Sequence, residues 1–160
     1  MQMKKKKKLI LLLTICFGMF LSVTGTVKAE DGVEVGNFRI DGGQLNADYR
    51  YASGVLTILS DQTLTIKNKN PATATTDRIV IPENVKANLI FAGVNIKTSA
   101  NSPFTLTPDA NGDGKGSMAH IILADSTTNK LVSGAASYPG LRCGETTTLY
   151  IDDSIVNKDI

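Results

Sequence analysis

Short runs of apolar and β-branched residues recur through the chain from residue 54 onward, and they limit its fold more than any other feature. Gly, Pro, Asn, Asp and Ser residues separate the runs, and no stretch beyond residue 29 keeps a helical period. Many runs lie roughly ten residues apart, which is typical of a sandwich, a barrel or a solenoid. The pattern therefore predicts an all-β domain and leaves its architecture open.

Three segments of the sequence can be superimposed on one another, and this self-similarity favours a solenoid. They are residues 77–99, 103–134 and 139–159, and each contains three short strand-like runs with turn residues between them. A three-sided parallel β-helix has this organisation, because each coil buries its inward side chains under the next coil. We therefore predict a parallel β-helix of about three coils over residues 54–160.

Alternation along these strands assigns one set of side chains to the interior of the coils. The only cysteine beyond residue 29, Cys143, belongs to this set. Because Cys143 has no second cysteine to pair with, no internal disulfide can form. We expect its side chain to be buried and to act as a small apolar residue of the core. The expected inward positions are Ile79, Ile81, Leu89, Phe91, Phe104, Leu106, Ile121, Leu123, Leu141, Cys143, Leu149 and Ile151.

The two ends of the expected solenoid differ in sequence. Residues 30–53 lack the repeat, and they are the natural N-terminal cap because a first coil needs cover. At the other end the chain stops at Ile160, in the third strand of the last coil, which would leave strand edges unpaired. Either the sequence is a truncated fragment that continues into further coils, or residues 157–160 cap it, or another chain does.

Residues 1–29 have the three parts of a secretory signal peptide. Lys4 to Lys8 are basic, Leu9 to Val23 form an apolar run, and Ala29 precedes the expected cleavage site. The alternative is a retained membrane anchor, but this apolar run of 15 residues is shorter than the roughly 20 residues that a span needs. We therefore expect a secreted, extracellular or cell-surface protein with no stable membrane span after cleavage.

Removal of the signal peptide changes the net charge of the chain. The full chain has 17 basic and 15 acidic residues, and six of the basic residues but none of the acidic ones lie within residues 1–29. The mature chain therefore carries 11 basic and 15 acidic residues, a net charge of −4. This balance gives no support to a basic surface for nucleic acid.

Five phrases of the sequence occur together in one known family. They are GVLTI at 54–58, TDRIV at 76–80, the strand pair at 85–96, NKLVSG at 129–134 and PGLRCGETTTLYI at 139–151. This series resembles the repeat domain of bacterial secreted and surface "carbohydrate-binding domain-containing" proteins, which are mostly large and Gram-positive. The resemblance covers about residues 36–156. It implies a right-handed parallel β-helix and a carbohydrate-binding role, brings no catalytic residues, and departs from the family where the chain stops, since members usually continue for many coils.

The segment 109–114 matches the opening of a calcium-binding loop, D-x-[DN]-x-[DN]-G. Alternate residues of such a loop direct oxygen atoms at one ion, so Asp109, Asn111 and Asp113 are the candidate calcium ligands. The full pattern is not met, because His120 stands at the twelfth position, where a bidentate Glu is expected. The alternative is a plain turn rich in Gly, Asp and Asn between two strands.

Sugar binding commonly uses aromatic rings as apolar platforms against the faces of sugar rings. The chain has no Trp, and four tyrosines lie outside the expected core. These candidate ligand-binding residues are Tyr49, Tyr51, Tyr138 and Tyr150. The alternative for each is packing in the cap or on the surface.

The resemblance implies a carbohydrate-binding or adhesion-type module that contacts carbohydrate or a cell-wall glycan, and we expect it to be non-catalytic. His120 is the only histidine, and no nucleophile motif such as G-x-S-x-G is present, so no enzymatic activity is expected. No cofactor is expected apart from calcium. Two alternatives stay open: a structural stalk or spacer segment of a larger surface protein, and a polysaccharide lyase-like enzyme.

Overall fold

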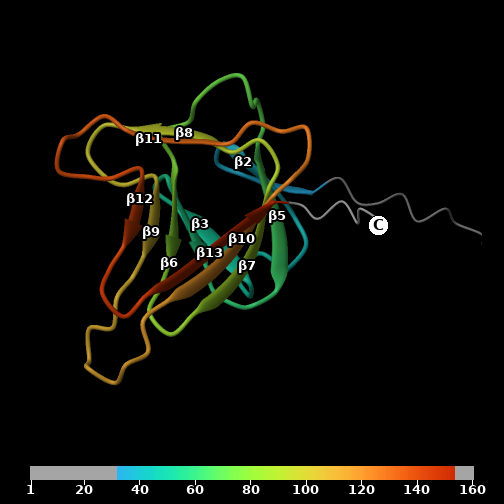
Figure 1. Ribbon diagram of the computed structural model, residues 1–160. Helices are drawn as coiled ribbons and strands as arrows, with labels where there is room; N and C mark the ends of the chain where they lie inside the picture. The colour runs from blue at the N-terminus through green and yellow to red at the C-terminus, as the bar shows by residue number, and fades with distance from the viewer. Residues whose placement is uncertain (1–31, 154–160) are drawn as a thin grey trace, which may run out of the picture. The chain divides into compact units, whose positions relative to one another are not determined.

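The structure is a computed structural model that describes residues 32–153. This part of the chain consists of thirteen β-strands joined by turns and loops, without a helix, which confirms the all-β prediction (Figure 1). It accordingly holds no apolar helix long enough to cross a membrane. The expected signal peptide at residues 1–29 and the last expected strand at residues 155–156 lie outside the described residues.

The strands form three sheets, which lie on different sides of one core (Figure 1). The six-stranded sheet contains, in spatial order, β1 (Val33–Val35), β2 (Phe38–Asp41), β5 (Thr63–Asn68), β7 (Lys86–Phe91), β10 (Met118–Leu123) and β13 (Thr148–Asp153). The five-stranded sheet contains β3 (Tyr49–Ala52), β4 (Val55–Ile58), β6 (Arg78–Ile81), β9 (Phe104–Leu106) and β12 (Leu141–Cys143). The two-stranded sheet contains β8 (Asn95–Thr98) and β11 (Lys130–Ser133).

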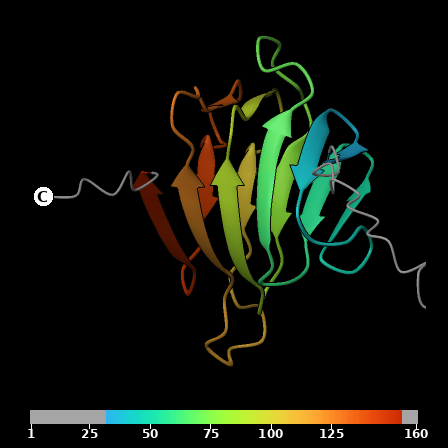
Figure 2. The same cartoon turned by 90° about the vertical axis from the view of Figure 1, so that its right-hand side faces the viewer.

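From β4 onward, every strand pairs in parallel with its equivalents in neighbouring segments of the chain. Strands of residues 77–99, 103–134 and 139–153 are therefore paired in parallel with one another, and we call each of these segments a layer. The parallel strands β5, β7, β10 and β13 stand side by side in Figure 2. The structure adds a layer that the superposition missed, made of β4, β5 and Thr75, which bridges to Ile96.

The core follows the alternation that the sequence predicted for the middle layers. Seven expected inward side chains are buried there: Ile79, Ile81, Leu89, Phe91, Phe104, Leu106 and Ile121. Strand register places equivalent positions of successive layers directly over one another, so that Ile79 lies opposite Phe104 and Leu89 opposite Ile121. Phe91 and Phe104 meet edge to face with ring centroids 6.0 Å apart. Such stacking gives one continuous hydrophobic cluster.

The expected inward residues of the last layer are not fully buried. Ile151 is 49% exposed and Cys143 is exposed, although both lie in register with core positions of the preceding layer. The prediction that Cys143 is a buried apolar residue is therefore wrong. The reason is that β12 and β13 are edge strands, and no described strand pairs beyond them. Two further inward positions of this layer, Leu141 and Leu149, are only partly buried, as is Leu123 of the preceding layer.

The segment expected as the N-terminal cap runs antiparallel at the opposite edge of both large sheets. β1 and β2 extend the six-stranded sheet beyond β5, and β3 pairs with β4 in the five-stranded sheet. Phe38 and Tyr49 from this segment are completely buried in the common cluster. Residues 36–37 form the turn between β1 and β2, where Gly36 adopts a φ of +54°.

Candidate functional site

The four candidate tyrosines lie in different settings and do not form one site. Tyr49 is fully buried, and its hydroxyl has no hydrogen-bond partner among the described residues. Burial, together with the charge of Asp48, raises the pKa of Tyr49. Its interpretation as a sugar platform is therefore wrong, because the segment around it contributes to the core. Tyr138 is exposed in the loop between β11 and β12, where its backbone N–H donates to Ala135.

Tyr51 is half-buried and links the N-terminal segment to the loop between β5 and β6. Its hydroxyl donates to Oδ2 of Asp77 at 2.9 Å, and its ring occupies the space beside Gly36, where a Cβ would lie 2.1 Å from Cζ of the ring. Burial and the hydrogen bond to Asp77 raise the pKa of Tyr51 to about 12. This tyrosine therefore holds two segments together, and its only donor is already used.

Tyr150 is the candidate with the most exposed ring. It lies on the outward side of β13 and is 56% exposed. The register places it directly opposite His120 of β10, and the two rings meet edge to face with centroids 6.4 Å apart. Nε2 of His120 lies 2.5 Å from Oδ2 of Asp152, which follows Tyr150 by two residues in β13. An aromatic face, an imidazole and a carboxylate therefore stand together on one surface.

This surface continues across the outward side of the six-stranded sheet, which faces the viewer in Figure 2. Strand register aligns four outward residues, which we call the outer row: Thr63, Asn88, His120 and Tyr150. Adjacent strands lie about 4.8 Å apart, so the row extends for about 14 Å. Its side chains offer hydroxyl, amide and imidazole groups beside one aromatic ring, a combination suited to a flat ligand with an apolar face and hydrogen-bonding edges.

The loop between β9 and β10 extends away from the strands at the bottom of Figure 2, and it carries the predicted calcium ligands. Carboxylate oxygens of Asp109 and Asp113 lie within 4.8 Å of each other and of one from Glu83. The amide nitrogen of Asn111 donates to Glu83 at 2.9 Å. The structure thus brings two predicted ligands together and adds Glu83, which lies outside the sequence motif.

Backbone groups of this loop surround the carboxylate of Asp109. The N–H groups of Asn111, Gly112 and Gly114 all donate to it, at 2.8, 2.9 and 2.5 Å. Desolvation raises the pKa of Asp109, but these hydrogen bonds outweigh it and lower the pKa below its usual value. Lys115 neutralises Asp113 through a 3.0 Å ion pair. The donor set is the hard-oxygen type that calcium takes, and calcium binding stays a prediction.

Asp77 is a functional candidate that the sequence did not suggest. It is 5% exposed and is the only buried charged side chain within residues 32–153. Its Oδ2 atom accepts hydrogen bonds from the backbone N–H and the amide of Asn37, at 2.9 and 3.0 Å, and from Tyr51. An Asp directly before a strand is ordinary turn chemistry, so no local signal distinguishes it.

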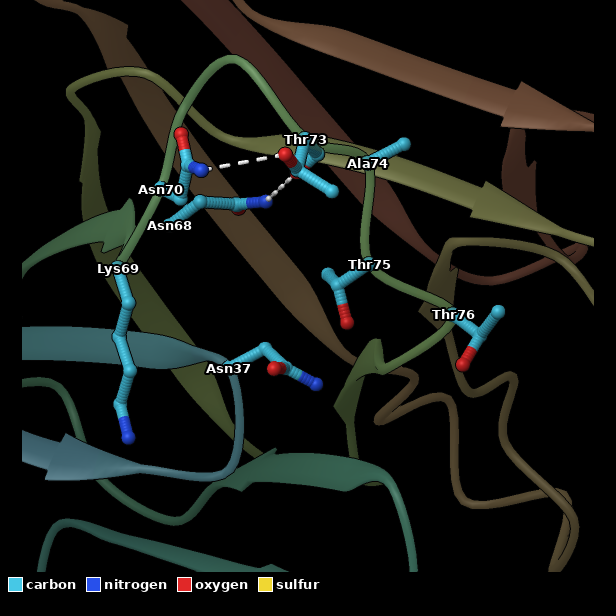
Figure 3. A pocket seen from close by; sticks show the side chains of 8 residues that line it. All are labelled: Asn37, Asn68, Lys69, Asn70, Thr73, Ala74, Thr75 and Thr76. Atoms are coloured by element: carbon cyan, nitrogen blue, oxygen red, sulfur yellow. Dashed lines mark hydrogen bonds between the residues drawn. The ribbon is translucent and has the colours of Figure 1, made fainter.

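Two hollows lie near this carboxylate, and Asp77 lines the second of them. The first has a volume of about 320 Å³ (Figure 3) and is lined by Asn37, Asn68, Lys69, Asn70, Thr73, Ala74, Thr75 and Thr76. The second has a volume of about 230 Å³ and is lined by Ser53, Gly54, Thr76, Asp77, Arg78, Thr98, Ser99, Ala100 and Asn101. Thr76 lines both hollows, which therefore adjoin at this residue.

The chain matches no protein-family model, no curated protein and no solved structure. The resemblance to bacterial carbohydrate-binding surface proteins has no second line of support, and the binding role that it implies stays a prediction. The geometry itself offers two separate polar surfaces, the outer row on the six-stranded sheet and the hollows beside Asp77.

Proposed function

We propose that this protein is a secreted or cell-surface, non-catalytic carbohydrate-binding module built on a right-handed parallel β-helix. The parallel register of successive layers supports this fold, and crossovers between parallel strands of one sheet are right-handed in almost all proteins. Asparagine side chains also join the layers at their turns. Asn68 accepts from the N–H of Asn95 and donates to its carbonyl, and Asn129 accepts from two N–H groups at residues 93–94.

The observation that carries the binding proposal is the exposed ring of Tyr150 within the outer row. A sugar ring has an apolar face that packs on an aromatic side chain, and its hydroxyls need donors and acceptors around that face. His120 and Asp152 supply them beside the ring, and Asn88 lies two strands away. Since the row crosses four strands, it suits several consecutive sugar units of an extended glycan.

A structural spacer is the second candidate, and a different observation favours it. The inward positions of β12 and β13, including Ile151 and Leu149, have the register of core residues but lack cover from the described residues. Further coils or another chain would bury them, as in a stalk made of many stacked layers. The spacer role and glycan binding are compatible. The spacer role uses the inward side chains and the open edges of β12 and β13, whereas glycan binding uses the outward side chains of the six-stranded sheet.

A glycan array probed with the full chain and two tyrosine variants tests the binding proposal. Tyr150→Ala should weaken glycan binding by about tenfold, which is the scale of an aromatic contact. Tyr138→Ala is the matched control, because it removes another exposed ring outside the outer row, and it should bind like the wild type. Absence of binding to every glycan, or equal losses in both variants, would contradict the proposal.

A further inference from the structure

We infer that the hollows beside Asp77 form a second binding site, which takes the hydroxyl groups of a single neutral sugar residue. This inference goes beyond the proposed function, because it concerns another part of the molecule and a smaller ligand. The outer row lies on the outward face of the six-stranded sheet. These hollows lie instead at the turns between β3 and β4, β5 and β6, and β8 and β9. Hereafter the two hollows and Asp77 together are called the Asp77 site.

The first argument is the incomplete satisfaction of a buried carboxylate. All three hydrogen bonds to Asp77 end on Oδ2, and no described residue forms an ion pair with it. Its Oδ1 atom accepts none from the described residues and is not a buried orphan, so it is an acceptor that solvent or a ligand can reach. Oδ1 lies 3.6 Å from the position that a Cβ on Gly54 would take, and both residues line the second hollow. This acceptor is therefore directed at the hollow.

The second argument is the chemistry of the walls. Thr75 accepts the N–H of Asp77 at 3.0 Å and keeps its own hydroxyl proton for donation. The hydroxyl of Thr76, which is exposed at the junction of the hollows, bonds to no other described residue. In Figure 3 the side chains of Asn37 and Thr75 point into the same space. The walls therefore combine a charged acceptor with groups that both donate and accept.

These walls select among ligand classes. The second hollow is lined by one carboxylate, Asp77, and one guanidinium, Arg78, so its charges balance and a neutral ligand is favoured over an anion. Lys69 on the first wall is already paired with Glu34 at 3.1 Å. A hard divalent cation takes six or more oxygen ligands, usually with several carboxylates, and only one carboxylate lines these hollows. A neutral polyhydroxyl group both donates to Asp77 and accepts from the threonines. The two hollows have volumes of about 320 and 230 Å³, at or below the lower limit for ligand pockets, which favours one sugar residue.

The test is a titration of the full chain with methyl glycosides of glucose, galactose, mannose and N-acetylglucosamine, followed by amide chemical shifts in NMR spectra. At least one glycoside should move the resonances of residues 75–78. Thr76→Val should weaken this binding roughly fivefold, the effect of losing one hydrogen bond. Thr128→Val, the same change at an exposed threonine outside the site, should leave it unchanged. Because Thr76 is exposed and forms no internal bond, its variant keeps the fold.

The possible results separate this inference from the proposed function. If no glycoside moves residues 75–78, or if Thr76→Val binds as tightly as the wild type, the Asp77 site is overturned. Binding that moves only the outer row overturns the Asp77 site and leaves the proposed function intact. Conversely, glycoside binding at residues 75–78 together with unchanged array binding by Tyr150→Ala sustains the Asp77 site and overturns the outer row.

Discussion

The two edges of the stacked sheets have similar inward positions but very different burial. At the edge formed by residues 33–52, Phe38 and Tyr49 are completely buried. At the edge formed by β12 and β13, Ile151 is 49% exposed and Leu149 is only partly buried. Both edges follow the alternation of a strand, so alternation determines only the direction of a side chain. Burial depends on whether other segments cover that side chain. Antiparallel strands give such cover at the edge formed by residues 33–52, and no described strand gives it at the edge formed by β12 and β13.

The largest effect expected from this contrast comes from matched deletions at the two edges. Phe38→Ala should lower the free energy of unfolding by about 3 to 5 kcal/mol, because it leaves a cavity in a fully packed core. Ile151→Ala should cost less than about 1 kcal/mol, because its side chain is half exposed and leaves no closed cavity. Urea unfolding followed by circular dichroism measures both values. Losses of equal size would mean that β13 is covered in solution.

The second prediction concerns the link that holds the covered edge in place. Asp77→Ala removes three hydrogen bonds and leaves the donors of Asn37 and Tyr51 without their acceptor, so the loss should be about 3 kcal/mol. Asp61→Ala removes an exposed carboxylate and should change stability by less than about 0.5 kcal/mol. The same urea experiment compares the two. A small loss for Asp77→Ala would show that the N-terminal segment packs through its apolar residues alone.

Sequence reasoning predicted the middle of the fold better than its edges. Inward positions such as Ile79 and Leu89 were correctly identified because strand alternation is a local property. The layer of β4 and β5 was missed, since its third side is a loop with a single bridge at Thr75 and did not align with the other repeats. The exposure of Cys143 could not be predicted from alternation, because it depends on the position of β12 at the edge of its sheet.

The candidate sites show the same limit. Asp109 and Asp113 belong to one short motif and were found in the sequence, whereas Glu83 joins them only because β6 and β9 pair in parallel. The bond between Asn37 and Asp77 joins residues 40 positions apart, and no sequence pattern connects them. Tyr49 was misassigned because its alternating aromatic pattern is equally typical of a platform and of a core strand.

Calcium should have a smaller effect, and it would act near the exposed edge. The backbone N–H of Asp109 donates to the hydroxyl of Thr146, beside β13, so an ordered loop helps to hold the last layer. Calcium at about ten times its dissociation constant should stabilise the protein by about 1.4 kcal/mol, or raise the melting temperature by about 5 °C. Thermal unfolding in calcium and in chelator measures this shift.

The matched variants of this experiment are Glu83→Gln and Asp125→Asn. The first removes a carboxylate of the cluster and should abolish most of the calcium-dependent shift. The second removes an exposed carboxylate in the turn after β10 and should leave the shift unchanged. If calcium does not change the melting temperature of the wild type, the loop is a plain turn and the calcium hypothesis fails.

The smallest predicted effect concerns Tyr51, and it distinguishes the two edges by pH. Its pKa is raised to about 12 in the folded protein, from 10.0, so the folded state holds the phenolic proton more tightly than the unfolded state. The resulting stability is fully present below pH 10 and is lost as the pH rises from 10 to 12. Tyr51→Phe should cost about 1 kcal/mol at pH 8 and reduce the fall in the urea midpoint over this range. Tyr138→Phe changes an exposed tyrosine near the other edge, so this control should lose as much stability at alkaline pH as the wild type. If Tyr51→Phe has the same pH profile as the wild type, the hydrogen bond from Tyr51 to Asp77 contributes nothing to folding.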